Sequence, residues 1–334
     1  MSSPQTETPF DLPYLTEIWK RYTRRGDKHT AGNWPMVKTV LEGLGLPLEE
    51  TLQYLGRQEP ALGEFKSWIL ERNDREVEPL RLERLRATLD GTPYSEEVVA
   101  NIRAIEESEP VLSPQDLSFW EEHGYIVLHD AISPAECRAA ELAVWDALQM
   151  DSDDKETWYE PSTHGIMRQF FHHPALRRNR NSARVHKAFA QIWASADLWM
   201  TVDRVSFNPP ERPDWQFPGP FLHWDTSLAP PIPFAVSGLI YLTDTPAEQG
   251  AFTCVPGFHR RIEDWLNGLP PNANPREEDL EALGAVPIPG RAGDLVIWHR
   301  ALPHGSRANR CTRPRIVQYL NMHPATREYC PEWK

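Results

Sequence analysis

The second half of the chain constrains the fold most, because short strand-like runs follow one another there without helix-like segments between them. The intervening loops are rich in proline or glycine, as in NPPERP at 208–213 and APPIP at 229–233. Strands that follow one another without crossover helices favour antiparallel pairing. The sequence therefore predicts a sandwich or jelly roll rather than a parallel α/β sheet. The runs cover 202–207, 237–243, 251–255, 293–298 and 315–322.

The first hundred residues show a different pattern, with apolar side chains at the i, i+3, i+4 and i+7 spacing of amphipathic helices. This segment has no cluster of His or Cys, so its apolar stripes are interpreted as packing faces rather than ligand sites. We expect residues 1–108 to form a helical region for packing, dimerisation or substrate cover, and residues 109–334 to form the β-rich domain. A homodimer formed through the helical region is one of these alternatives. The stripes comprise Leu15, Ile18, Trp19 and Tyr22; Val37, Val40, Leu41 and Leu44, with Gly45 past the helix end; Phe65, Trp68 and Ile69; and Leu82, Leu85 and Leu89.

Signals for shorter elements follow near residue 110. Ser113 can begin a short helix that ends at Gly124, and the apolar run at 125–128 is typical of a strand. A capping box with proline at the first helical position starts at Ser133, so a helix is expected from there to about Met150.

The charge balance narrows the range of partners. A formal net charge of -13 argues against nucleic acid and anionic membrane, since both bind basic surfaces. No apolar stretch reaches the roughly 18 residues of a transmembrane helix. The N-terminus has neither the basic nor the apolar part of a secretory signal. The expected location is therefore the cytoplasm, with the four cysteines as buried free thiols.

The strongest chemical signal is the segment FLHWD at 221–225. On a strand, residues two apart point to the same side, so His223 and Asp225 would converge on one point. An imidazole and a carboxylate are two members of the 2-His-1-carboxylate set that binds iron(II) with open positions. Taken alone, the pair fits equally well a histidine hydrogen-bonded near an aspartate.

A third ligand is expected from a distant strand. His304 follows the apolar run DLVIW closely and precedes Gly305 and Ser306, small residues that allow close approach. His299 competes for the role, but it directly continues the run and has no such small neighbours. We therefore predict a metal site formed by His223, Asp225 and His304.

Three segments resemble the phytanoyl-CoA dioxygenase family: HWD at 223–225, QGAFTCVPGFHR at 249–260 and HGSRANRCTRPR at 304–315. The resemblance covers roughly residues 115–325 and leaves the first hundred residues outside it. It implies a double-stranded β-helix (jelly roll) core that uses Fe(II), 2-oxoglutarate as cosubstrate and O2. It also implies a dioxygenase that hydroxylates an unactivated C–H of a small molecule and releases succinate and CO2.

Residue by residue, the resemblance implies that His223, Asp225 and His304 bind the iron. It further implies that Arg315 binds the distal carboxylate of 2-oxoglutarate, and that the hydroxyl of Ser306 bonds the same carboxylate. A planar guanidinium suits that role because it can donate two parallel hydrogen bonds to a carboxylate. A turn between His304 and Arg315 is expected to place both on one interior wall. Arg313 competes with Arg315, but it is as well explained by a surface ion pair.

Further expectations concern residues outside these motifs. Arg168 is a substrate-binding candidate, whereas most of the neighbouring arginines at 177–184 are expected on a solvated basic face. His259 is expected to bond backbone in a turn, and Trp224 to pack in the core. Halogenating members of the family replace the carboxylate, so the presence of Asp225 favours hydroxylation. The alternative function is a metal-binding cupin-like protein or isomerase without oxygenase activity, which would need no arginine anchor.

Overall fold

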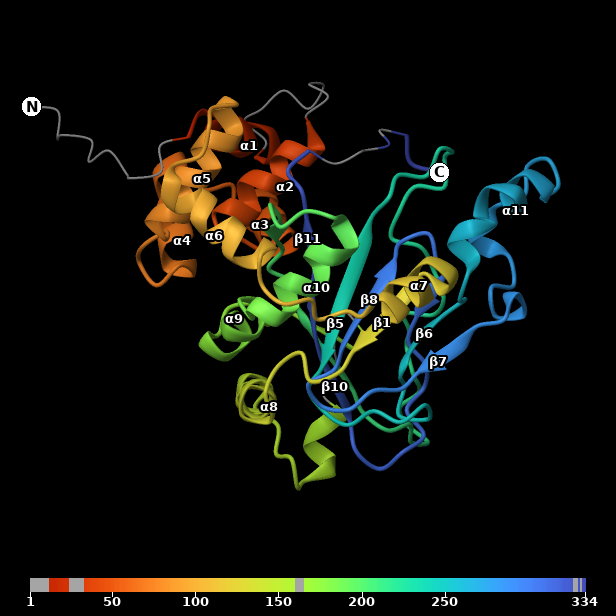
Figure 1. Cartoon of the computed structure of the whole chain (residues 1–334). Coiled ribbons are helices and arrows are strands. Elements are labelled where there is room, and N and C mark those ends of the chain that lie inside the picture. Colours follow the sequence, from red (N-terminus) through yellow and green to blue (C-terminus); the bar gives the residue numbers. More distant parts are fainter. Residues whose placement is uncertain (1–11, 24–32, 160–164, 327–329, 331) are drawn as a thin grey trace, which may run out of the picture. The chain divides into compact units, whose positions relative to one another are not determined.

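The computed structural model describes residues 12–23, 33–159, 165–326, 330 and 332–334, which form two compact units (Figure 1). The first unit lies within Met1–Ala104, Asp197–Val202 and Pro324–Arg327, and the second within Ile105–Ala196, Asp203–His323 and Glu328–Lys334. The first unit thus takes in two later segments that the sequence did not reveal. The domain boundary between 108 and 109 stays a prediction.

The first unit is helical and packs around its own core. All four predicted apolar stripes lie on helices, except that Leu44 directly follows its helix, and Leu15, Val40, Phe65 and Leu85 are fully buried together. Gly45 follows the second helix with a φ of +66°, a conformation that glycine adopts without strain. The helices are α1 (Pro13–Tyr22), α2 (Trp34–Gly43), α3 (Leu48–Gln58), α4 (Leu62–Arg72), α5 (Pro79–Asp90) and α6 (Glu96–Glu106), and strand β3 (Trp199–Met200) also lies in this unit.

The second unit begins with the predicted helix, strand and helix: α7 (Pro114–His123), β1 (Tyr125–Leu128) and α8 (Pro134–Leu148). Ser113 and Ser133 form the N-terminal capping boxes of the two helices. The sequence analysis did not identify the elements that follow, which are η1 (Lys155–Tyr159), β2 (Met167–Arg168), α9 (Pro174–Arg180) and α10 (Ala183–Trp193). Of these, η1, β2 and α9 are short, whereas α10 spans 11 residues with an apolar face that was overlooked among the basic residues.

Two antiparallel sheets form the centre of the second unit. The larger sheet has the strand order β1-β8-β5-β10-β4-β2, and the smaller has the order β7-β6-β9. This confirms the prediction of antiparallel sheets in a chain that mixes helix and strand. The strands are β4 (Val205–Asn208), β5 (Val236–Tyr241), β6 (Phe252–Cys254), β7 (Val286–Ile288), β8 (Leu295–His299), β9 (His304–Gly305), β10 (Arg315–Leu320) and β11 (Met322–His323).

The expectation of strands without helices between them is wrong at one place. Helix α11 (Ile262–Gly268) and short 3-10 turns lie between β6 and β7. Residues 262–268 span only two turns, and a segment of this length is too short to show the apolar periodicity of a helix.

The core between the sheets contains a buried hydrogen-bonded link. Apolar side chains of β5, β8 and β10 pack there against those of β6 and β7. Tyr241, fully buried on β5, donates its hydroxyl hydrogen to the carbonyl of Ile288 at 2.7 Å and accepts from the backbone N–H of Phe252 at 2.9 Å. One side chain of the larger sheet thereby satisfies two backbone groups of the smaller sheet.

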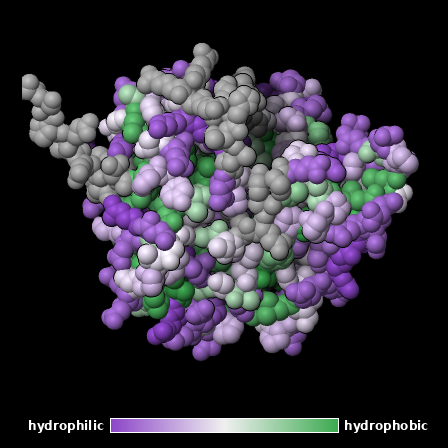
Figure 2. All heavy atoms as spheres, turned by 90° about the horizontal axis from the view of Figure 1, so that it is seen from above, coloured by the Kyte–Doolittle hydropathy of each residue, from purple (hydrophilic) through white to green (hydrophobic). Residues whose placement is uncertain are grey.

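The view in Figure 2 is predominantly hydrophilic, with hydrophobic side chains in small separate areas. Among the helices that the structure describes, none has the length and apolar character needed to cross a bilayer.

We predict that Tyr241→Phe lowers the free energy of unfolding by about 1–3 kcal/mol, because two buried backbone groups lose their partner. Urea denaturation followed by circular dichroism measures this change. The matched control is Tyr125→Phe on β1, whose hydroxyl makes no hydrogen bond to any described residue. The control should lose no more than about 0.5 kcal/mol. Equal losses in the two variants would show that the link contributes nothing.

Candidate metal centre

The segment that carries His223 and Asp225 is not a regular strand, contrary to the sequence analysis. His223 instead forms an isolated antiparallel bridge with His304, the first residue of β9. The backbone N–H of His223 donates to the carbonyl of His304 at 2.9 Å, and the N–H of His304 donates back at 3.0 Å. The chain turns away directly after this bridge. Reciprocal backbone pairing therefore fixes the two imidazoles next to each other, with ring centroids 4.8 Å apart.

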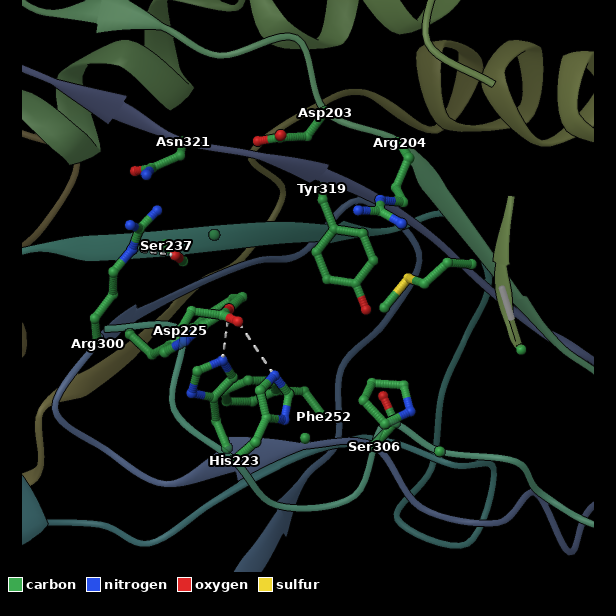
Figure 3. A pocket seen from close by; sticks show the side chains of 18 of the residues that line it. Asp203, Arg204, His223, Asp225, Ser237, Phe252, Arg300, Ser306, Tyr319 and Asn321 are labelled. Atoms are coloured by element: carbon green, nitrogen blue, oxygen red, sulfur yellow. Dashed lines mark hydrogen bonds and ion pairs between the residues drawn. The ribbon is translucent and has the colours of Figure 1, made fainter. Parts of the chain in front are cut away.

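Asp225 completes a group of three metal-ligating side chains (Figure 3). Its two carboxylate oxygens lie 3.4 Å from Nε2 of His223 and 3.2 Å from Nε2 of His304. One ligand atom from each residue lies within 4.8 Å of the other two. The distances fit three donors that converge on one ion, as a facial 2-His-1-carboxylate site requires.

Backbone carbonyls set the orientation of both imidazoles. Nδ1 of His223 lies 2.7 Å from the carbonyl of Phe221, and Nδ1 of His304 lies 3.0 Å from the carbonyl of Leu302. A carbonyl only accepts, so each Nδ1 carries a hydrogen, and the nitrogen left to bind a metal ion is Nε2 in both rings. Metal-binding histidines in proteins are held in this way.

The charges at the group favour a cation. Burial tends to raise the pKa of Asp225, but hydrogen bonds from His223 and His304 outweigh it and hold the pKa well below its usual range. Burial likewise tends to lower the pKa of His223, yet the bond to Asp225 and its charge raise that pKa overall. A carboxylate that stays ionised beside two imidazole nitrogens matches the donor set of a divalent transition metal.

Two residues outside the predicted site hold the Asp225 segment in place. Trp224 is buried, as expected, and its indole N–H donates to the carbonyl of Ala301 at 3.0 Å. Arg276 donates to the carbonyls of Trp224 at 2.9 Å and Thr226 at 2.7 Å, on either side of Asp225. The sequence analysis missed Arg276, since no local pattern relates it to a segment fifty residues away.

The three side chains open into a cavity of about 440 Å³. Its apolar lining includes Met167, Phe252, Trp298 and Leu320. None of the polar residues that line it, apart from the three candidate ligands and Ser306, was identified from the sequence. They are Asp203, Arg204, Ser237, Arg300, Tyr319 and Asn321.

His299 does not line this cavity. It lies at the end of β8 in a separate, smaller pocket next to His259, where burial and that neighbour lower its pKa to about 3. Nε2 of His259 lies 3.3 Å from the backbone carbonyl of Glu121, in agreement with the expected backbone bond. The geometry therefore brings His304, and not His299, to the other two candidate ligands.

Arg315 is fully buried behind the cavity wall. Its Nη1 donates to the hydroxyl of Ser306 at 2.8 Å, and its Nη2 lies 3.4 Å from the hydroxyl of Tyr319, while both hydroxyl-bearing residues line the cavity. Its Nε has no hydrogen-bond partner, and no carboxylate of the described residues pairs with it. A buried guanidinium without a counter-charge is costly, so this arrangement fits an anionic ligand at the Ser306 side of the cavity.

The expectation that His304 and Arg315 share one wall is wrong. His304 starts β9 in the smaller sheet, whereas Arg315 starts β10 in the larger one. The guanidinium reaches Ser306 from the opposite sheet. The competitor Arg313 is exposed and donates to the backbone carbonyl of Ser152 at 3.1 Å.

Arg168 is not among the described residues that line the cavity. Its guanidinium donates to the carbonyl of Gly165 at 2.6 Å, while the adjacent Met167 faces the cavity. Arg180 departs from the expected solvated face, because it is buried and donates to the carbonyl of Phe171 at 2.9 Å.

Comparisons with known proteins agree with the resemblance noted in the sequence. Residues 120–317, more than half of the chain, match the family model described as Phytanoyl-CoA dioxygenase (PhyH). An ectoine dioxygenase of Nocardia farcinica is 24% identical over 228 residues, which cover 62% of this chain and 76% of that protein. The ectoine dioxygenase of Halomonas elongata is 26% identical over 231 residues, covering 63% of this chain and 69% of that protein.

Solved structures show weaker similarity. The non-heme alpha ketoglutarate dependent carbocyclase SnoK from nogalamycin biosynthesis is 22% identical, with a TM-score of 0.49. The match covers 67% of this chain and 90% of that protein. This similarity is too low to bear on the reaction of the present chain.

We predict that His304→Ala weakens Fe(II) binding by more than about 100-fold, because loss of a ligand exceeds the 10–100-fold effect of losing an outer hydrogen bond. Anaerobic competition with a chromophoric chelator measures the affinity. His299→Ala is the matched control, since it removes the nearby imidazole that faces another pocket. Loss of Fe(II) binding in the control, with retention in His304→Ala, would contradict the assignment.

Proposed function

The chain belongs to the phytanoyl-CoA dioxygenase family, and from that premise we propose that it is an iron(II)- and 2-oxoglutarate-dependent oxygenase. One observation carries the proposal. The three converging donors of His223, Asp225 and His304 open into the same cavity as Ser306 and Tyr319, which contact the buried guanidinium of Arg315.

In this proposal His223, Asp225 and His304 hold the iron. The carbonyls of Phe221 and Leu302 keep both Nε2 atoms available as ligands. The hydrogen bonds of Arg276 on both sides of Asp225 limit the freedom of the carboxylate. Preorganised ligands need little rearrangement when the ion binds.

Arg315 holds the distal carboxylate of 2-oxoglutarate, with Ser306 as a second contact. The guanidinium is fully buried, so its attraction to a carboxylate is screened far less than it would be in water. The hydroxyl of Ser306 lies between Arg315 and the cavity and can rotate to donate to the same carboxylate. The apolar core around β5, β8 and β10 keeps bulk water from the charge.

Fe(II), 2-oxoglutarate and O2 together supply an oxidant strong enough to attack an unactivated C–H, with succinate and CO2 as products. The chain contributes binding and orientation. Met167, Phe252 and Leu320 give part of the cavity an apolar wall that excludes water from the reacting carbon. We propose hydroxylation as the outcome, because Asp225 occupies the carboxylate position that halogenating relatives lack.

The cavity volume of about 440 Å³ lies in the usual range for small-molecule sites, so the proposed substrate is a small molecule. The two antiparallel sheets suit a double-stranded β-helix core. The helical region within residues 1–108 is proposed to serve packing, dimerisation or substrate cover.

A cupin-like metal protein or isomerase without oxygenase activity is the alternative. It would use the same three metal ligands but would not need a buried arginine beside Ser306. The absence of a carboxylate partner for Arg315 within the described part of the chain favours the oxygenase.

We predict that Arg315→Lys and Arg315→Ala weaken 2-oxoglutarate binding at least about tenfold, because two charge-assisted hydrogen bonds are lost or misplaced. The visible charge-transfer band of the anaerobic Fe(II) protein, titrated with 2-oxoglutarate, reports the affinity. The lysine variant keeps the buried charge and guards against unfolding. The exposed Arg313→Ala should bind 2-oxoglutarate as the unchanged protein does. Undiminished binding in both Arg315 variants would favour the cupin-like alternative.

A further inference from the structure

A second guanidinium, that of Arg300, lines the same cavity and is held rigidly by β5. Arg300 directly follows β8, and its backbone N–H donates to the carbonyl of Ala235 at 2.8 Å. Its Nε donates to the carbonyl of Val236 at 3.1 Å and to the hydroxyl of Ser237 at 2.8 Å. Three consecutive residues of the neighbouring segment therefore fix both the backbone and the guanidinium of Arg300.

The two terminal nitrogens of Arg300 make no hydrogen bond or ion pair with any residue that the structure describes. Other arginines of the chain do find carboxylates: Arg72 pairs with Glu50 at 2.8 Å, and Arg212 with Asp214 at 2.8 Å. Arg300 makes no such pair, although Asp225 lines the same cavity. The fork of its terminal nitrogens is thus oriented by the protein and available to a ligand.

Arg300 and the 2-oxoglutarate site proposed above lie on different sides of the metal group. Figure 3 shows Arg300 and Ser237 on one side of Asp225, and Ser306 and Tyr319 on the other. A cosubstrate anchored at Ser306 would therefore leave Arg300 to a second ligand.

We propose that Arg300 anchors the substrate, and that the substrate is a small molecule with a carboxylate group. This inference rests on the proposed oxygenase function, because it takes the Ser306 side of the cavity to be occupied by 2-oxoglutarate. The terminal edge of a guanidinium matches the two oxygens of a carboxylate. Binding there would leave the remainder of the substrate close to Asp225 and the metal.

The surrounding charges favour a carboxylate over a phosphate. Asp203 and Asp225 both line the cavity, and a dianionic phosphate would be repelled by them more strongly than a single carboxylate. Arg204 also lines the cavity, and both Arg204 and Asp203 have other interactions within the protein. Met167 and Leu320 offer apolar surface for a hydrocarbon part of the same substrate.

Simple anions test the proposal without knowledge of the natural substrate. The Fe(II) protein is saturated with 2-oxoglutarate under anaerobic conditions, and calorimetry then measures the binding of acetate, butyrate and benzoate. The corresponding amides, which have the same shape without the charge, serve as matched ligands, and methyl phosphate represents phosphate monoesters. We expect the carboxylates to bind and the amides to bind at least about tenfold more weakly.

Three variants identify the residue responsible. Arg300→Gln should weaken carboxylate binding at least about tenfold. The carboxylate affinity of Arg300→Lys should lie between those of Arg300→Gln and the unchanged protein, since lysine keeps the charge but not the two-pronged guanidinium. Arg310→Gln is the control, because Arg310 is exposed and does not line the cavity. All three variants should keep the visible band that reports 2-oxoglutarate binding.

Several outcomes would overturn the proposal. These are equal binding of acids and amides, including no binding of either, unchanged carboxylate affinity in Arg300→Gln, and tighter binding of methyl phosphate than of every carboxylate. If the unchanged protein lacked the 2-oxoglutarate band, the proposed oxygenase function would fail instead. Calorimetry without 2-oxoglutarate would then show whether Arg300 still binds carboxylates.

Discussion

The reciprocal pair of backbone hydrogen bonds between His223 and His304 is the interaction on which the whole site depends. It joins a loop to the smaller sheet and brings together residues 81 positions apart in the chain. Because these bonds join main-chain atoms, they fix the backbone positions of both histidines. The carbonyls of Phe221 and Leu302 then fix the orientation of each ring. Asp225 follows two residues later, and Arg276 holds its segment on both sides so that the carboxylate faces the same point.

The cavity concentrates charges that the protein itself does not balance. Arg315 is buried and donates to a hydroxyl, and the Nε of Arg300 donates to Ser237 of β5. Neither arginine has a carboxylate partner among the described residues. Asp225 is held ionised by two imidazoles. A fully buried guanidinium such as that of Arg315 destabilises a fold unless a ligand neutralises it, so its presence points to function. An iron ion would balance the charge of Asp225, a cosubstrate carboxylate that of Arg315, and a substrate carboxylate that of Arg300.

Local patterns in the sequence predicted much of the fold. The capping boxes at Ser113 and Ser133, the stripes of the first unit and the strand runs depend on neighbours within a few residues, and the structure bears them out. The assignment of 221–225 to a strand was wrong. Two side chains that are two residues apart can also converge when a single bridge residue is followed by a bend, as at His223. Arg276 and Arg300 could not be predicted, since their roles depend on which distant backbone carbonyls they reach.

The most direct test of the oxygenase assignment is the release of CO2 from 2-oxoglutarate labelled in the carboxylate next to the keto group. The account predicts release that requires the protein, Fe(II) and O2 together and that is lost in Asp225→Ala. Protein that binds Fe(II) and 2-oxoglutarate but releases no more labelled CO2 than a protein-free control, with or without small carboxylates, would contradict it.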